Sequence, residues 1–86
     1  MYAIHHVGGA VVVRKMPKAE AEAYVAHVNG NAPSGAFPER ARLATGSEAR
    51  AVMEDRLLDR AVFVRRADVR RLSMSVLMEV FNDRFA

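Results

Sequence analysis

Two adjacent glycines, Gly8 and Gly9, constrain the fold more than any other feature of the sequence, because they separate two runs rich in β-forming residues. Glycine readily adopts the positive φ angles that the favoured two-residue hairpin turns need. We therefore expect an antiparallel hairpin between residues 2–7 and 10–16. A two-residue turn also fixes the pairing register, so the residues on each face of the hairpin can be assigned.

Alternate residues of the hairpin share a face, and one of the two faces carries the larger apolar cluster. We expect this face to point into the core. Its members are Tyr2, Ile4, His6, Val11, Val13 and Lys15. The opposite face carries Ala3, His5, Val7, Val12 and Arg14.

A helical segment is expected to follow the hairpin. Pro17 suits the first position of a helix and Gly30 suits its end, so the helix should run to about Asn29. The next stretch, Asn29–Gly46, is rich in Asn, Pro and Gly and is expected to be a loop. Loops of this length are uncommon in small domains and often carry function.

Thr45 and Glu48 match a capping box, which predicts a second helix that ends near Asp59. The short β-branched segment Ala61–Arg65 is expected to be a third strand beside the hairpin, because a hairpin alone is barely stable in water. The alternative is that the second helix continues through Phe63.

A third helix is expected from about Asp68 to Arg84, and Ser73 is able to divide it by capping a second start. Together these elements predict an α+β fold, in which a three-stranded antiparallel sheet packs against about three helices. A chain of 86 residues has room for one small domain, residues 1–86.

The composition, with 51% hydrophobic and 27% charged residues, is typical of a globular domain and excludes a disordered chain. The absence of cysteine excludes disulfides and thiolate metal ligands. Because small secreted domains usually depend on disulfides, a cytoplasmic location is expected. The longest apolar runs, such as Ala10–Val13, are far too short to span a membrane, and we expect no secretory signal.

The expected third helix has apolar residues on two opposite sides. At 100° per residue, one side carries Val69, Leu72, Val76 and Val80, and the other carries Met74, Leu77, Met78, Phe81 and Phe85. A surface helix of a small monomer needs only one apolar side. We expect the valine side to face the sheet and the Met/Phe side to bind a partner, either a second copy in a homodimer or a different protein. The alternative is that the chain covers both sides itself.

Four arginines, Arg65, Arg66, Arg70 and Arg71, lie within seven residues. A basic patch of this kind can grip phosphates, and with Arg14 and Lys15 it forms a candidate nucleic-acid-binding set. The alternative is a solvated face on which Asp68 pairs with Arg65 or Arg71.

The histidines, serines and acidic residues are not arranged as in catalytic or metal-binding sites. His5 and His6 are neighbours in a strand, so they point to opposite faces and cannot hold one metal ion together. No serine has the sequence context of a nucleophile. Glu54 is expected to form an exposed ion pair with Arg50, one helical turn away. We therefore expect no enzymatic activity, no cofactor, no metal and no small-molecule substrate.

The leading hypothesis is a non-enzymatic protein–protein interaction module that acts by docking or blocking, as an adaptor or as a phage- or mobile-element-type inhibitor of host machinery. Its expected partner-binding residues are Met74, Leu77, Met78, Phe81, Phe85, Arg70 and Arg71. The alternative hypothesis is a small basic nucleic-acid-binding regulator. Its expected contacts are Arg14, Lys15, Arg65, Arg66, Arg70 and Arg71.

Overall fold

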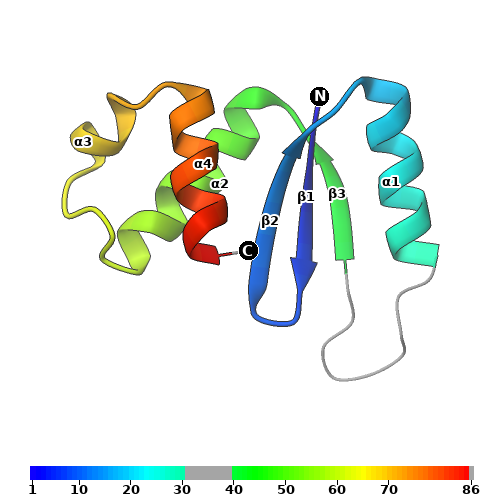
Figure 1. Cartoon of the computed structure of the whole chain (residues 1–86), viewed down its shortest axis with the longest axis horizontal. Coiled ribbons are helices and arrows are strands. Elements are labelled where there is room, and N and C mark those ends of the chain that lie inside the picture. The colour runs from blue at the N-terminus through cyan, green and yellow to red at the C-terminus, as the bar shows by residue number, and fades with distance from the viewer. Residues whose placement is uncertain (31–39, 86) are drawn as a thin grey trace.

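The computed structural model of the chain describes residues 1–30 and 40–85 and has an α+β fold (Figure 1). Helices lie on both sides of the sheet. In chain order the elements are β1 (Tyr2–Val7), β2 (Ala10–Lys15), α1 (Lys18–Gly30), β3 (Arg40–Ala44), α2 (Gly46–Asp59), α3 (Arg66–Arg70) and α4 (Met74–Phe85).

The expected hairpin is confirmed with its register. β1 and β2 are antiparallel, with Tyr2 opposite Lys15 and Val7 opposite Ala10. Gly8 has a φ of 60°, and glycine at the first central position is typical of a hairpin turn that matches the twist of its strands. The helix expected from Pro17 is confirmed as α1.

The third strand of the sheet is β3, which pairs antiparallel with β1 to give the order β2-β1-β3. The expected strand at Ala61–Arg65 is wrong, and so is the alternative of a helix through Phe63, because α2 ends at Asp59. β3 lies inside the stretch Asn29–Gly46, which was expected to be a loop. Residues 31–39 of that stretch lie outside the described residues.

The end of α2 explains why residues 61–65 do not form a strand. The Val62 amide donates to the carbonyl of Leu57 at 2.9 Å, and the Ala61 amide donates to that of Leu58 at 3.1 Å. These two bonds form a Schellman motif, which places Ala61 in the left-handed region with a φ of 56°. Glycine usually occupies this position, so an alanine there hides the stop signal.

The beginning of α2 and the division of the last helix are both confirmed. Thr45 caps α2, since its hydroxyl oxygen accepts from the Glu48 amide at 3.2 Å. Ser73 separates α3 from α4, and its hydroxyl oxygen accepts from the Val76 amide at 3.3 Å. The backbone therefore changes direction between α3 and α4 instead of continuing as one helix (Figure 1).

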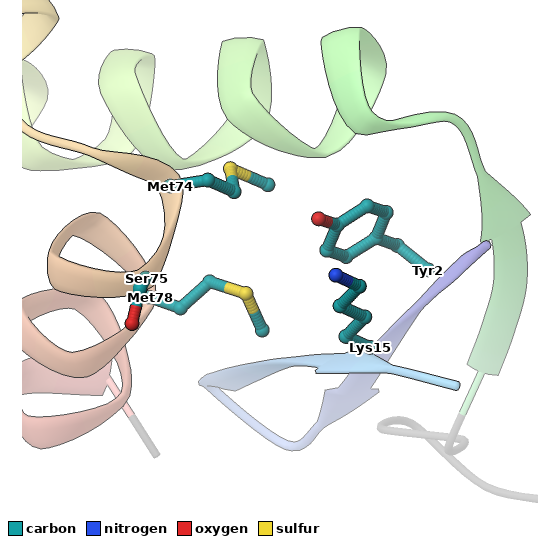
Figure 2. A pocket seen from close by; sticks show the side chains of 5 residues that line it. All are labelled: Tyr2, Lys15, Met74, Ser75 and Met78. Carbon is teal, nitrogen blue, oxygen red and sulfur yellow. The ribbon is translucent and has the colours of Figure 1, made fainter. Parts of the chain in front are cut away.

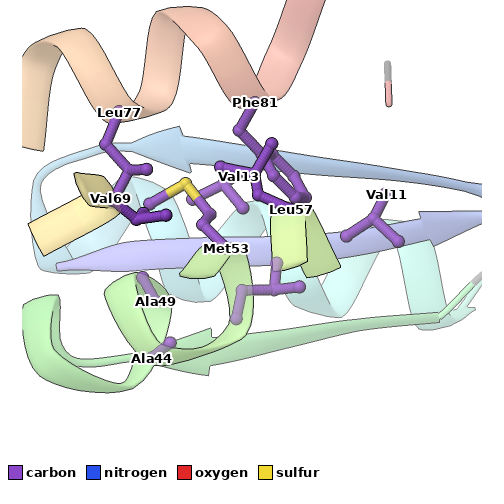
Figure 3. Close-up of a cluster of buried hydrophobic side chains, with 10 residues drawn as sticks. Val11, Val13, Ala44, Ala49, Met53, Leu57, Val69, Leu77 and Phe81 are labelled. Carbon is purple, nitrogen blue, oxygen red and sulfur yellow. The ribbon is translucent and has the colours of Figure 1, made fainter. Parts of the chain in front are cut away.

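The main core lies between the sheet and the three helices α2, α3 and α4 (Figure 3). Its sheet side contains three members of the expected core face, whereas His6 at the end of that face is exposed. Its buried members are Ile4, Val11, Val13, Ala44, Ala49, Met53, Leu57, Val69, Leu77 and Phe81.

The opposite face of the sheet is covered by α1. Small side chains are buried there, among them Ala3 on β1, Ala21 on α1 and Ala41 on β3. The Nδ1 atom of His5 lies 2.7 Å from the Tyr24 hydroxyl of α1. Small residues let a helix approach a sheet closely.

An asparagine side chain covers the outer edge of each outer strand. Asn82 of α4 accepts from the Val13 amide at 3.3 Å and donates to the Val13 carbonyl at 3.1 Å. Asn29 of α1 makes the equivalent pair with Ala41, at 2.8 and 2.9 Å. Each amide thus takes the place of a neighbouring strand at one residue, which protects an edge that would otherwise pair with another chain.

Ala61→Gly should stabilise the fold by about 0.5–1 kcal/mol, because glycine removes the steric cost of a left-handed residue. Ala51→Gly is the matched control. Ala51 is exposed in the middle of α2, and the same change there should destabilise by about 1 kcal/mol. Urea denaturation of both variants measures the difference. Equal destabilisation at the two positions would contradict the left-handed ending of α2.

Candidate interaction surface

The Met/Phe side of α4 points into the molecule, which reverses the expected orientation. Leu77 and Phe81 have no exposed surface and pack in the same cluster as Met53 and Leu57 of α2 (Figure 3). Leu77 and Phe81, both expected to bind a partner, are therefore not accessible to one in the folded chain. Phe85 is half-buried and stacks on Phe81 at a centroid distance of 4.9 Å.

The break at Ser73 is the physical reason for this reversal. The expected valine side requires one continuous helix. Val69, however, belongs to α3 and Leu72 to the connection, so neither extends the surface of α4. Of that side, α4 keeps only Val76 and Val80, and Val76 is 43% exposed. The chain therefore buries one main apolar side of α4 without a partner.

Beside this buried side, α4 and the sheet leave a groove of about 370 Å³ (Figure 2). Met74 and Met78 extend into it from α4, and Tyr2 and Lys15 extend toward them from the sheet. The fifth lining residue is Ser75. Met74 and Met78 belong to the expected partner-binding set, whereas Tyr2 and Ser75 do not.

Two contacts hold the walls of the groove in place. Tyr2 and Lys15 are direct partners across β1 and β2, so their side chains leave the sheet side by side. On the other wall, Asn82 holds α4 against β2 at Val13. Met78 lies one helical turn before Asn82, and Lys15 lies two residues after Val13 on the same sheet face. The register of the sheet and the amide of Asn82 therefore bring the two walls together.

The groove combines apolar walls with one positive charge. Lys15 is its single charged lining residue. Within residues 1–30 and 40–85, no carboxylate lies within ion-pairing distance of the Lys15 amine. The groove is thus chemically suited to an apolar group that carries a negative charge nearby.

The arginine cluster surrounds a buried carboxylate. The expected pair between Glu54 of α2 and Arg50 forms, but it is not exposed as expected, because Glu54 is only 5% exposed. Arg50 Nε donates to Glu54 at 2.9 Å, and Arg66 donates to the same carboxylate at 3.3 Å. The Arg70 Nε atom lies 3.5 Å from it. A buried carboxylate needs such partners, so these arginines have a structural role at the junction of α2 and α3.

Arg50 also holds the end of α3. Its Nη2 atom donates to the carbonyls of Val69 at 3.3 Å, Arg70 at 3.2 Å and Leu72 at 2.7 Å. The last carbonyls of a helix have no partner inside the helix. One guanidinium therefore satisfies the end of this five-residue helix and links it to α2.

Arg65, Arg66 and Arg71 differ in how far an acidic partner neutralises their charge. Arg66 pairs with Asp55, and this hydrogen bond raises the pKa of the Arg66 guanidinium against the opposing effect of desolvation. Arg65 pairs with Asp68, which is one of the two pairings expected for a solvated face. Arg71 is exposed and has no ion pair among the described residues.

The six candidate nucleic-acid contacts do not form one patch. Arg14 and Lys15 are neighbours in β2 and point to opposite faces of the sheet. Arg14 lies 5.6 Å from the ring centroid of Tyr24 on α1, at the opposite end of the molecule from α3 (Figure 1). Neither Arg70 nor Arg71 lines the groove.

Histidines and carboxylates make no metal site in the part of the chain that the structure describes, where no group of three potential ligands gathers. His6 is separated from His5 by the sheet. Partial desolvation of its imidazole, together with the positive charges of Arg56, Arg42 and His5, lowers the pKa of His6. None of the helices in the described ranges is both long and apolar enough to cross a bilayer.

No protein family model, curated protein or solved structure matches the chain.

Phe81→Ala should destabilise the fold by about 3–5 kcal/mol, because it opens a cavity in the main core. Phe85→Ala removes the same ring from a half-buried position and should cost less than half as much. Chemical denaturation followed by circular dichroism measures both losses. If Phe81→Ala were as stable as the unaltered chain, the inward orientation of α4 would be wrong.

Arg50→Met should destabilise the fold by about 1.5–3 kcal/mol, because it removes charge-assisted hydrogen bonds to Glu54 and to the end of α3. Arg65→Met is the control, since Arg65 makes an exposed pair with Asp68, and such pairs contribute about 0–1 kcal/mol. The same denaturation experiment compares the two. Similar losses for both variants would show that the buried carboxylate does not organise the cluster.

Proposed function

We propose that this chain is a non-enzymatic protein–protein interaction module that acts by docking, and that the groove between α4 and the sheet receives a segment of its partner. The observation that supports the proposal is the pairing of two half-buried methionines, Met74 and Met78, with an open space of about 370 Å³. Methionine side chains are flexible and polarisable, so they adapt to the shape of an inserted group.

The size of the groove favours a short segment over a broad interface. A space of this volume is at the small end of the range for ligand pockets, enough for one or two side chains. Leu77 and Phe81 are already covered by the chain itself. We therefore propose a different protein as the partner, with the second copy of a homodimer as the competing occupant. Docking of this kind is compatible with the blocking role of a phage-type inhibitor.

We also propose a cytoplasmic site of action, because the chain has no cysteine and small secreted domains usually depend on disulfides.

Nucleic-acid binding is the second candidate, and the exposure of three cluster arginines supports it. The side chains of Arg65 and Arg70 are 76% and 69% exposed, and Arg71 is exposed as well. Contacts to phosphate weaken steeply as salt rises, whereas docking through methionines responds little. A mobility shift with duplex DNA at two salt concentrations distinguishes the candidates, and salt-sensitive binding that Arg71→Gln reduces would favour this one.

The interaction proposal is tested by selecting binders from a displayed library of random peptides against the whole chain. Met78→Gln places a polar group of similar size in the groove, and we expect it to weaken the selected peptides at least tenfold. Val76→Gln is the matched control, because Val76 is exposed on the other side of α4. The selected peptides should bind Val76→Gln as tightly as they bind the unaltered chain. Circular dichroism checks that both variants are folded.

Selected peptides that bind Met78→Gln and Val76→Gln equally well would contradict a partner site in the groove. Ser75→Gln gives a second, independent check, since Ser75 is exposed and lines the groove without entering the core. It should also weaken binding.

A further inference from the structure

We propose that the partner segment is both apolar and acidic, with an apolar side chain between Met74 and Met78 and a neighbouring carboxylate on Lys15. This inference rests on the proposed docking function and names the chemistry of the partner.

Lys15 supplies the charge of the groove. Among the five lining residues it is the single charged one, and no acidic side chain lines the space. An ammonium group carries three donors and no acceptor, so it favours a carboxylate over a neutral group. The chain as a whole carries a formal charge of +3, which favours approach of an acidic segment and disfavours a basic one.

A second donor faces the same space. Tyr2 extends from β1 beside Lys15, with its hydroxyl directed toward Met74 (Figure 2). Within the described residues this hydroxyl makes no hydrogen bond. It is therefore available to a polar atom of an inserted segment, while the two methionines accept the apolar part.

The edge of β2 determines how such a segment lies. A peptide that added a strand to this edge would need the outward N–H and C=O groups of Val13, but Asn82 already bonds both. A continuous ladder along β2 is therefore blocked. Recognition depends on side chains in the groove, so Lys15 sets the preferred charge and orientation of the segment.

A charge exchange tests this inference. Random-peptide selection is repeated with the whole chain and with Lys15→Glu. We expect Asp or Glu beside Leu, Met or Phe in peptides from the first selection, and Lys or Arg at the same place in the second. The amidated consensus peptide of the first selection should bind Lys15→Glu at least tenfold more weakly. Lys18→Glu is the control, since it makes the same charge change at an exposed residue that does not line the groove.

The possible failures point to different conclusions. Peptides that lose binding in Met78→Gln but show no acidic preference and bind Lys15→Glu normally would overturn this inference and leave the docking function intact. Peptides insensitive to both groove variants, or no enriched peptide, would overturn both. Light scattering that shows a dimer, converted to a monomer by Met78→Gln, would identify a second copy as the occupant and also overturn the inference.

Discussion

The burial of Leu77 and Phe81 against α2 and the sheet determines what α4 presents to other molecules. These two side chains have no exposed surface, so the centre of the apolar side of α4 belongs to the core. Met74 and Met78, at the margin of that side, remain accessible where they face Tyr2 and Lys15 at the open end of the hairpin. The groove is thus a consequence of core packing.

The arginine–glutamate cluster at Glu54 supports the same arrangement from the other end. α3 has only five residues and could not persist on hydrogen bonds within the helix alone. Arg50 satisfies its last carbonyls and pairs with Glu54, while Val69 of α3 is buried in the main core. Polar and apolar contacts together place α3, and through it the start of α4. The cluster that suggested phosphate binding in the sequence therefore has a structural explanation for much of its charge.

Features set by local signals could be predicted from the sequence, and features set by distant contacts could not. The glycine turn and the Thr45 cap act within a few residues, so the hairpin and the start of α2 were found. β3 has the sequence Arg-Ala-Arg-Leu-Ala, with no β-branched residue, and becomes a strand only because β1 pairs with it. Ala61 in a left-handed conformation carries no glycine signal.

Each wall of the groove could be predicted from local signals, but the approach of the two walls to each other could not. The spacing of Met74 and Met78 marks an apolar side of a helix, and the hairpin register places Tyr2 beside Lys15. Nothing local joins the two pairs, because the contact between Asn82 and Val13 spans most of the chain.

Methionine methyl NMR with a soluble paramagnetic probe tests the account most directly, because the methionines sample each environment. We expect strong broadening for Met1, which is 39% exposed, intermediate broadening for Met74 and Met78, and least for Met53, which is 0% exposed. If the methyl groups of Met74 and Met78 were as protected as that of Met53, no open groove would exist beside α4. The account of this surface would then be wrong.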